Sequence, residues 1–404
     1  MKVQQTASLR IIFFVVVIDL IGFGIILPLL PLYAKSYGAA PFVIGLLWIS
    51  YSVTQFLFNP ILGAISDRVG RRPIILMSLV GSVIFYTLFG WAPSLFWLFV
   101  ARFAAGVFAA NISTAMAFIA DITTKENRAK GMGLIGAAVG TGFIIGPAVG
   151  GFLSQYNYSL PGYGAAILSL IALLLAISKL PESLNANNIE HPQKKSLHSI
   201  LKPMAQAMNT QEVARPIFVY FLVVFAFANM QVTFPLFTQE MFHFDVVQNG
   251  YVFAFVGMLA VLFQGGLIGR LSKRLGVGPL AILGTVISMI GLLLIPFAKT
   301  VPFLLFFMTL LGIGTGLNTP TLTSLVSISS DETHQGSVLG VSRSFSTLAR
   351  ILGPLWGGWS YGALGMRWPY WSAGVILGLA ILIGLPLWRI KPSYQKEVVV
   401  VADT

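Results

Sequence analysis

The sequence has no cysteine, only four histidines and little charge, since Asp, Glu, Lys and Arg make up 9% of its 404 residues. The absence of cysteine excludes disulfides, thiolate metal sites and cysteine nucleophiles. His191, His198, His243 and His334 all lie outside the apolar stretches, which argues against a histidine-ligated metal in an apolar interior. A soluble domain carries about a quarter charged residues. The composition therefore argues against an ordinary soluble protein.

Signatures of ATP-driven machines and of hydrolases are also missing. No segment matches the phosphate-binding pattern GxxxxGK[ST], whose backbone would cradle a nucleotide. No serine, histidine and acid combine within an apolar stretch. We expect no enzyme, no cofactor and no bound metal. We also expect no drive by ATP, so that the energy for transport would come from a proton gradient.

Apolar residues are abundant: they make up 56% of the chain, and its mean hydropathy is +0.84. A membrane-spanning helix needs about 20 of them in succession. The sequence predicts an all-α membrane protein whose twelve transmembrane helices lie at 10–34, 42–65, 73–91, 94–121, 129–154, 162–180, 214–240, 246–270, 277–298, 302–328, 335–362 and 368–388.

The net charge of +12 reflects membrane topology. With the N-terminus in the cytoplasm, cytoplasmic segments hold 19 of the 25 basic residues and outer loops hold three, Lys35, Lys299 and Arg367. Basic residues favour cytoplasmic loops. We therefore expect both termini in the cytoplasm and the lipid bilayer as surroundings, and no nucleic acid as partner.

The chain divides into two related halves. We expect an N-terminal six-helix bundle over 1–180, a cytoplasmic linker over 181–213, and a C-terminal six-helix bundle over 214–404 that ends in a short cytoplasmic tail. Asn111 aligns with Asn318 and Gly146 with Gly353, both at an offset of 207 residues. Parallel six-helix repeats with substrate between them are a known transporter plan.

A glycine-proline pattern marks the fifth and eleventh predicted spans. Small residues four apart let another backbone approach closely, and proline weakens a helix at a fixed depth. We expect a hinge at which each of these spans packs against the other half. Its residues are Gly142, Gly146, Pro147, Gly150, Gly353 and Pro354.

The motifs together resemble those of the major facilitator superfamily. The loop after the second span carries its signature, Gly63, Asp67, Arg68, Gly70, Arg71 and Arg72. The fourth span carries a similar arginine motif, Leu98-x-x-x-Arg102-x-x-x-Gly106. The glycine-proline spacing of the fifth span resembles the drug:proton antiporter branch, as do Asp19, Gly22, Pro28 and Pro31.

Within that branch the chain resembles tetracycline-efflux-like multidrug transporters. Tyr51, Gln55, Pro60, Gly63 and Gln264 match residues of that group. Three of its polar positions are changed, because Phe85 and Ser288 stand in place of aspartates and Ala260 in place of a histidine. The resemblance implies drug efflux in a bacterial inner membrane, and the changes argue against assuming tetracycline itself.

The resemblance also implies a cytoplasmic gate built from Gly63, Asp67, Arg68, Gly70, Arg71, Arg72 and Asp121. Asp67 and Arg71 would form a latch with Asp121 and with the start of the eleventh span. Lys273 replaces the aspartate in the second half, which makes the latch one-sided. The alternative is that Arg68, Arg71 and Arg72 only set the topology.

Among the charged residues inside predicted spans, where charge is costly and usually functional, three are candidates for a role, whereas Arg343 is expected to be structural. Asp19 is the carboxyl placed well inside a span, and with Arg102 and Arg350 it is our candidate for proton coupling. The alternatives are a structural ion pair for Asp19, snorkelling to the interface for Arg102, and contact with an anionic substrate for Arg350.

Amide and aromatic side chains in the spans suit an amphipathic organic ligand. The candidates for substrate binding are Tyr51, Gln55, Asn111, Asn229, Gln231, Gln264 and Asn318. Interhelical hydrogen bonds are the alternative for the amides, and ordinary packing is the alternative for the aromatic ring.

These features favour a monomeric secondary transporter that exports small amphipathic compounds in exchange for protons by alternating access. The second hypothesis is a facilitator or proton-coupled importer of a sugar or an organic anion. The third is a receptor without transport activity, which would require a soluble module that the sequence does not contain.

Overall fold

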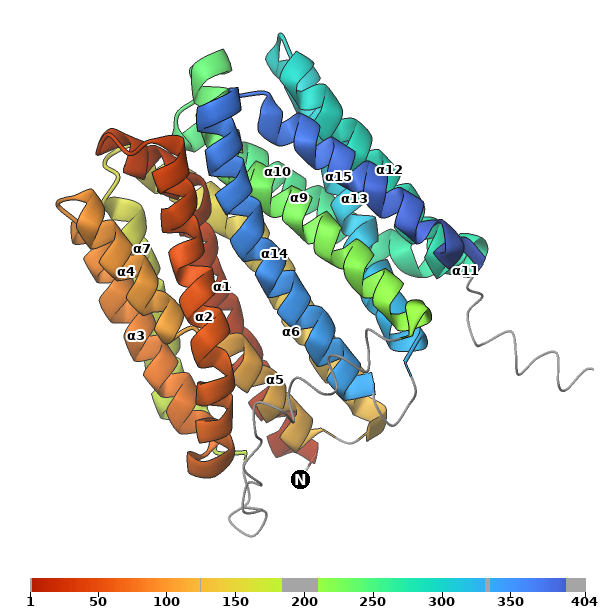
Figure 1. Cartoon of the computed structure of the whole chain (residues 1–404). Helices are drawn as coiled ribbons and strands as arrows, with labels where there is room; N and C mark the ends of the chain where they lie inside the picture. Colours follow the sequence, from red (N-terminus) through yellow and green to blue (C-terminus); the bar gives the residue numbers. More distant parts are fainter. Residues whose placement is uncertain (1, 124, 184–209, 331–334, 390–404) are drawn as a thin grey trace, which may run out of the picture. The chain divides into compact units, whose positions relative to one another are not determined.

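The computed structural model describes residues 2–123, 125–183, 210–330 and 335–389, and every regular element within these ranges is a helix (Figure 1). Eleven helical stretches of this part are long and apolar enough to cross a membrane. They coincide with eleven of the twelve predicted spans. The predicted class, an all-α membrane protein, is confirmed.

The remaining predicted span, 335–362, is the helix α14 (Gln335–Leu364). It is less apolar than the others because Arg343, Arg350 and several serines and glycines lie in it. Its 30 residues correspond to about 45 Å, which exceeds the thickness of the apolar core of a bilayer. α14 is therefore long enough to span.

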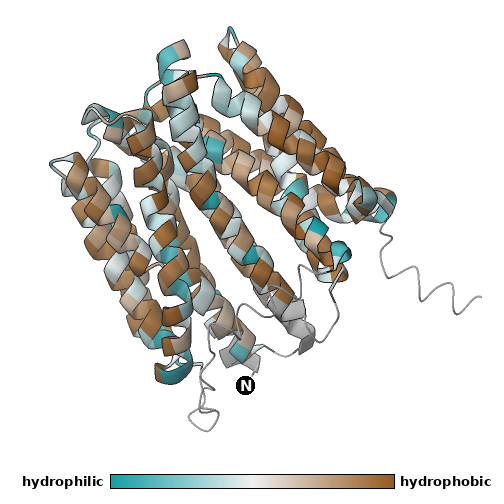
Figure 2. Cartoon of the chain, in the orientation of Figure 1, coloured by the Kyte–Doolittle hydropathy of each residue, from teal (hydrophilic) through white to brown (hydrophobic). Residues whose placement is uncertain are grey.

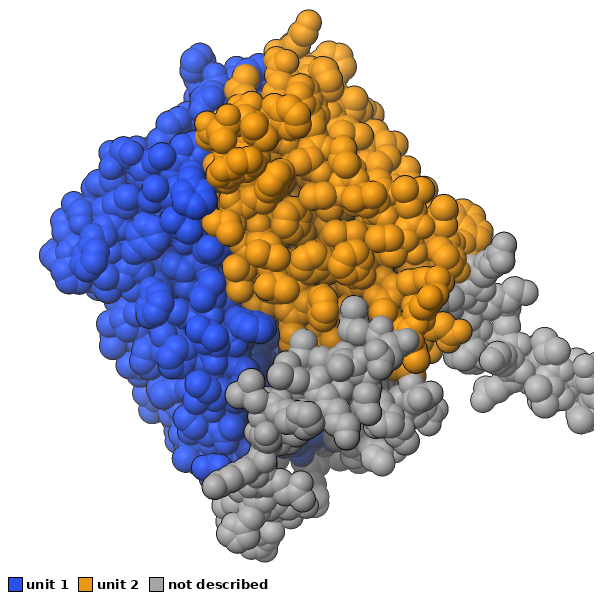
Figure 3. Space-filling view, in the orientation of Figure 1, with its two compact units in different colours: residues 1–193, 234–257 blue, residues 194–233, 258–404 orange. Residues whose placement is uncertain are grey.

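The chain forms two compact units (Figure 3). The first contains the described residues of 1–193 together with Phe234–Gly257. Its complete helices are α1 (Lys2–Ser36), α2 (Pro41–Val69), α3 (Arg71–Trp91), α4 (Leu95–Val107), α5 (Asn111–Ile122), α6 (Lys125–Ser154) and α7 (Leu160–Lys179). The end of α9 (Gln211–Phe242) and most of α10 (Val246–Leu262) also belong to it.

The second unit contains the described residues of 194–233 and those from Met258 onward. Its further elements are the π-helix η2 (Phe263–Leu267), α11 (Ile268–Leu275), α12 (Val277–Leu294), the 3-10 turn η3 (Ile295–Phe297), α13 (Val301–Ile328), α14, α15 (Trp368–Gly384) and the 3-10 turn η4 (Leu385–Arg389). The units thus differ from the two sequence halves by the segment Phe234–Gly257. Most of the predicted linker and of the predicted tail lies outside the described residues, and the division into halves stays a prediction.

Large apolar side chains remain exposed along the helices, as expected for surfaces that meet lipid. On α7, for example, Ile167, Leu174 and Ile177 are each at least half exposed. Figure 2 shows apolar residues along most of the length of the helices in each unit. In lipid such side chains carry no hydrophobic penalty, so the helices associate through close packing and polar contacts instead.

The fourth predicted span, 94–121, is two helices and not one. α4 ends at Val107, and α5 starts at Asn111. The segment between them contains no proline or glycine, so the sequence does not predict a helix break there. A physical reason lies in a neighbouring helix: the Gln55 Nε2 donates a hydrogen bond to the Ala109 carbonyl at 3.3 Å, which satisfies a carbonyl in the break.

Glycines bring α1 and α6 together. A β-carbon placed on Gly146 would lie 2.6 Å from the Gly24 Cα, and one on Gly142 would lie 2.7 Å from the Leu20 Cβ. A β-carbon on Gly150 would overlap the Ile25 carbonyl oxygen. These glycines lie four residues apart on one face, so the predicted close approach of another backbone is confirmed.

Candidate functional site

Asp19 lies near the middle of α1 and is half-buried. Ser82 of α3 donates a hydrogen bond from its Oγ to Asp19 Oδ1 at 3.3 Å. The side chain of Asn111, the first residue of α5, lies nearby. A carboxyl with a polar partner inside a span can exist with or without its proton, which is the chemistry that a proton carrier needs.

Arg102 of α4 is 4% exposed. Its guanidinium carbon lies 4.6 Å from the centre of the Tyr51 ring, a cation–π contact. Its Nε has no hydrogen-bond partner among the described residues. A guanidinium stays charged at any physiological pH, so the aromatic face of Tyr51 is the main stabilising contact seen for this buried cation.

Tyr86 of α3 connects these two charged residues. It lies within electrostatic reach of Asp19, Tyr51 and Arg102. Asp19 and Arg102 form no ion pair in the part of the chain that the structure describes. The structure thus gathers two of the three predicted proton-coupling residues into one group. We name it the Asp19 cluster, and it consists of Asp19, Tyr51, Ser82, Tyr86, Arg102 and Asn111.

The third predicted proton-coupling residue, Arg350, lies on α14 in the second unit. Its side chain is exposed, and no hydrogen bond or ion pair of it occurs within the described ranges. Arg350 thus belongs to a different unit from Asp19, and its role in proton coupling stays a prediction.

The predicted latch residues come together at the junction of α2 and α3. Arg71 pairs with Asp67 through Nη1, and with Asp121 of α5 through Nε at 3.0 Å. The Arg71 Nη1 also donates to Ser66 Oγ at 2.8 Å. The expected contacts of Arg71 with Asp67 and Asp121 are therefore present, and their gating role stays a prediction. Contacts with the start of the eleventh span fall mostly outside the residues whose side chains are described.

Sequence analysis missed Glu182 in this region. Its Oε1 accepts a hydrogen bond from the Arg71 N–H at 2.9 Å, and its Oε2 accepts one from the Arg72 N–H at 3.1 Å. Glu182 thereby caps the start of α3, where a carboxylate is favoured by the helix dipole. A glycine is required at Gly70, because its φ is +107° and a β-carbon there would collide with the Glu182 carboxylate. A search for acids just beyond the sixth span could have found Glu182.

Two further residues of the gate motif have different surroundings. Arg72 donates from NH2 to the Ile177 carbonyl at 2.8 Å, near the end of α7. Gly63 faces open space, since no atom lies within 4 Å of its β-carbon position. Arg68 is exposed in the last turn of α2, which fits the alternative role of setting topology.

The glycine-proline residues of each span contact more than one helix. Gly142, Gly146 and Gly150 pack on α1, which belongs to the same sequence half. Likewise Gly353 packs against Phe225 and Ala228 of α9 in the second unit. The small-residue face therefore shows where a backbone approaches but not which one, and the role of these residues as a hinge stays a prediction.

The opposite face of α6 does meet a helix of the second sequence half. A β-carbon on Gly151 would lie 3.1 Å from the Val247 carbonyl oxygen, and one on Gly257 would lie 2.8 Å from the Phe143 carbonyl oxygen. A β-carbon on Gly250 would overlap the Pro147 carbonyl oxygen. These contacts of α10 lie within the first unit and account for its inclusion of Phe234–Gly257.

Several residues predicted to bind substrate take part in helix packing. Asn229 of α9 is fully buried and donates from Nδ2 to the Pro369 carbonyl at 2.8 Å. Asn318 of α13 is also fully buried, and its Oδ1 accepts a hydrogen bond from Thr285 Oγ1 at 3.1 Å. Both arrangements match the interhelical alternative. Gln231 and Gln264 are half-buried, and Gln264 lies in the π-helix η2. Substrate binding by these four residues stays a prediction.

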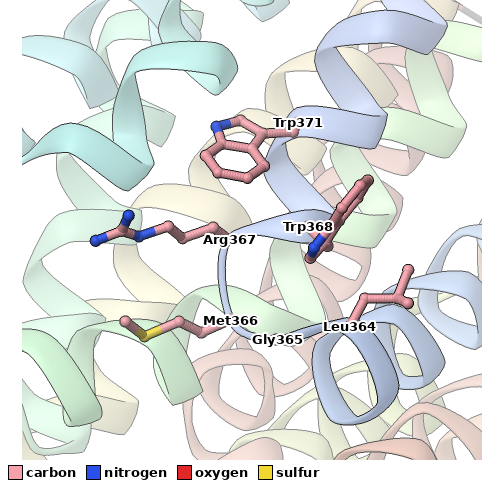
Figure 4. A pocket seen from close by; sticks show the side chains of 6 residues that line it. All are labelled: Leu364, Gly365, Met366, Arg367, Trp368 and Trp371. Carbon is pink, nitrogen blue, oxygen red and sulfur yellow. The ribbon is translucent and has the colours of Figure 1, made fainter.

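A surface pocket lies at the loop between α14 and α15 (Figure 4). Its lining consists of Leu364, Gly365, Met366, Arg367, Trp368 and Trp371. None of the predicted substrate-binding residues lines it. Tryptophans beside a helix end are typical of the membrane–water interface, and we assign this pocket no part in the candidate site.

Comparison with known proteins identifies the family. The model of the Major Facilitator Superfamily matches residues 12–276 and 265–402. The chain belongs to the Major Facilitator Superfamily. The members of this family that the chain matches are transporters and not enzymes, in agreement with the sequence-based expectation.

Two curated relatives share nearly the whole length of this Major Facilitator Superfamily chain. The tetracycline resistance protein, class E, of Escherichia coli is 30% identical over 380 residues and covers 91% of each chain. Multidrug resistance protein 2 of Bacillus subtilis is 28% identical over 386 residues, which span 92% of this chain and 93% of the relative. The predicted resemblance to drug antiporters of this superfamily is confirmed.

A solved structure supports the fold. The nucleoside transporter NupG matches with a TM-score of 0.79 at 14% identity, over 95% of this chain and 100% of that one. Together with the candidate spans, the family establishes an integral, multi-pass membrane protein.

Proposed function

We propose that this transporter exports small amphipathic compounds in exchange for protons by alternating access. The observation that carries the proposal is the carboxyl of Asp19 inside α1, which accepts a hydrogen bond from Ser82. Support comes from the relatives, which include tetracycline and multidrug resistance proteins. Both named relatives are bacterial, and we place this chain in the inner membrane with both termini in the cytoplasm, as its basic residues favour.

Asp19 is the proton carrier in this proposal. A proton that moves inward releases about 2.3 kcal/mol per 100 mV of membrane potential, in addition to the pH difference. Protonation removes the charge from Asp19 and changes its hydrogen bond with Ser82. Arg102, which lacks a carboxylate partner, would respond to the charge of Asp19 through Tyr86.

The Arg71 contacts form the cytoplasmic latch of the proposal. The Arg71 side chain pairs with Asp67 and Asp121, and its backbone N–H donates to Glu182, so that α2, α3 and α5 are tied at one end. Ion pairs of this kind can hold one state and release in another. The rings of Tyr51 and Phe23 lie 5.5 Å apart between their centres, and aromatic side chains of this kind suit an amphipathic compound.

The test is uphill transport in everted membrane vesicles from a drug-sensitive host. The substrate comes from a screen of tetracyclines, fluoroquinolones, dyes and sugars. Under an imposed pH gradient the wild-type protein should accumulate the compound. Asp19→Asn should abolish accumulation while leaving exchange of labelled for unlabelled substrate.

Asp245→Asn is the matched control. Asp245 lies in the first unit, and its Oδ1 accepts hydrogen bonds from the Val247 and Gln248 N–H groups. Asparagine caps a helix about as well as aspartate, so this variant should still accumulate substrate. Accumulation by Asp19→Asn at the wild-type level would refute the assignment of Asp19. Proton-driven uptake only in right-side-out vesicles would favour the importer instead.

A further inference from the structure

The outer side of the second unit carries positive charge without acidic partners. Lys299 and Arg367 lie in loops that face outward in the predicted orientation, and both side chains are exposed. Neither forms an ion pair with a residue that the structure describes. The sequence has no Asp or Glu from 246 to 330 or from 333 to 396. The chain on either side of these loops therefore supplies no carboxylate to balance them.

The other charges of the predicted outer side have partners in the first unit. The third outer cation, Lys35, pairs with Glu240, with 3.8 Å between Nζ and Oε1. The Asp245 carboxylate accepts hydrogen bonds from the N–H groups at the start of α10. Basic residues favour cytoplasmic loops, so two unpaired cations on the outer side of one unit require an explanation other than topology.

Both cations border one group of aromatic rings. The ring centres of Trp368 and Trp371 lie 5.9 Å apart, and those of Phe297 and Trp371 lie 6.2 Å apart. Lys299 follows Phe297 by two residues, and Arg367 directly precedes Trp368. We name these five residues the outer aromatic cluster.

The pocket at the loop between α14 and α15 lies at this cluster (Figure 4). In Figure 4 the side chains of Arg367 and Met366 extend from the loop in the same direction. The volume of the pocket is about 180 Å³. Sites for drug-sized ligands begin at roughly 300 Å³. The pocket therefore suits a small anionic group with a short apolar stretch, and not a whole drug molecule.

Backbone hydrogen bonds fix the loop that carries Arg367. The Trp368 N–H donates to the Gly365 carbonyl at 3.1 Å, and the Trp371 N–H donates to the Arg367 carbonyl at 3.2 Å. Gly365 has a φ of +108°, a conformation that favours glycine. The turn thus holds the guanidinium of Arg367 beside the two indole rings.

Two indole N–H groups of the cluster are available to a ligand. The neighbouring Trp356 donates from Nε1 to Ser372 Oγ at 2.9 Å. In contrast, the indole N–H groups of Trp368 and Trp371 make no hydrogen bond within the described part of the chain. A guanidinium binds phosphate through two parallel N–H bonds, and indoles at a membrane interface donate to polar groups there. A phosphate would serve as acceptor for both kinds of donor.

We propose that the outer aromatic cluster binds the headgroup phosphate of an anionic phospholipid. Arg367 and Lys299 supply the charge, and the two indole N–H groups supply further donors. A lipid is favoured over a free anion because large apolar side chains are exposed around the cations: Phe297 is 59% exposed and Leu364 is 44% exposed. Acyl chains would cover these side chains. The inference is independent of Asp19 and goes beyond the proposed transport function.

The test uses the absence of cysteine from the chain, since Leu364→Cys gives one position for a fluorescent label at the pocket. The labelled full-length protein is reconstituted in phosphatidylcholine vesicles with increasing fractions of phosphatidylglycerol. Either lipid is brominated on its acyl chains, and contact with bromine quenches the label. The label should report a preference for phosphatidylglycerol of about tenfold, as expected for a hydrogen bond between charged groups.

Variants in the Leu364→Cys background locate the preference. Arg367→Gln should remove most of it, and Arg367→Lys should keep a part, because lysine lacks the planar fork that binds phosphate. Lys299→Gln should lower it by less than Arg367→Gln. Lys35→Gln is the matched control, since it removes the outer cation that has a carboxylate partner, and it should leave the preference unchanged. The same label at Tyr156→Cys, 70% exposed in the first unit, should show no preference.

The outcomes separate a lipid site from simpler readings. Equal quenching by the two lipids at Leu364→Cys would overturn the inference, as would an equal loss in Lys35→Gln and Arg367→Gln. Inorganic phosphate in excess should not change the quenching. If it abolishes the preference, the cluster binds free phosphate and the lipid assignment is wrong. Asp19→Asn should retain the preference, so that failure of this site and failure of the proposed function are seen separately.

Discussion

Alanine at Gly146 should destabilise the protein, because this glycine lies where α6 touches the backbone of α1. A β-carbon at Gly146 would lie 2.6 Å from the Gly24 Cα, 2.7 Å from the Gly24 carbonyl carbon and 2.8 Å from the Ile21 carbonyl oxygen. All three atoms belong to the backbone, so no change of side-chain rotamer relieves the overlap. The helices would have to separate.

The size of the effect follows from two opposing contributions. Carbon atoms normally pack at about 3.5–4.0 Å, so the helices must part by roughly 1 Å, and such overpacking costs about 1–3 kcal/mol. Alanine gains about 1 kcal/mol over glycine in helix propensity. The expected net loss is about 1 kcal/mol, with an upper limit near 2 kcal/mol.

Gly133 and Gly136 provide controls on the same helix. No atom lies within 4 Å of the β-carbon position of either residue. Gly133→Ala and Gly136→Ala should therefore be neutral or stabilising, by up to about 1 kcal/mol from helix propensity alone. The measurement is the apparent Tm in detergent, determined from the loss of the monodisperse peak in size-exclusion chromatography as the temperature is raised. An apparent Tm of Gly146→Ala equal to or above that of Gly136→Ala would refute the close α1–α6 contact.

Three further predictions concern charged residues. Arg102→Lys keeps the charge but loses the planar group that stacks on Tyr51. Substrate transport should therefore fall about tenfold at unchanged protein yield. Transport at the wild-type rate would contradict a role for the stacking. Glu182→Gln should weaken the start of α3 by about 1 kcal/mol, which would be seen as faster hydrogen exchange at Arg71 and Arg72. The control Glu212→Gln removes an exposed acid in the first turn of α9 and should leave the exchange rates at Arg71 and Arg72 unchanged. Glu240→Gln breaks the exposed pair with Lys35 at 3.8 Å and should change the apparent Tm by no more than the equivalent of about 1 kcal/mol; a larger loss would show that this pair holds the first unit together.

Hydropathy alone predicted most of the fold. Spans are long apolar segments because backbone groups in lipid must be hydrogen-bonded within a helix, and this constraint is visible in the sequence. The glycine spacing of the fifth span likewise predicted a close backbone approach. It did not identify α1 as the partner, because the spacing of small residues indicates which helix face is narrow and not which helix packs on it.

The site was predicted less completely. Asp19 stood out because charge is rare inside the spans, whereas Arg71 and Asp121 followed from the family resemblance, and the structure gives each of them polar partners. The break before Asn111 was not foreseen, since Phe108 and its neighbours include no helix-breaking residue. The contact that supports the break, from Gln55 to the Ala109 carbonyl, is tertiary and is not visible in the local sequence. Glu182 was missed because it appeared to belong to the linker.

A direct test of the central claim is proton release on substrate binding. Purified protein in weakly buffered detergent solution receives a substrate from the screen, and a pH-sensitive dye reports the protons released. The wild-type protein should release protons in proportion to the substrate bound, and Asp19→Asn should bind substrate without releasing them. Equal proton release by Asp19→Asn would contradict Asp19 as the site at which proton and substrate compete.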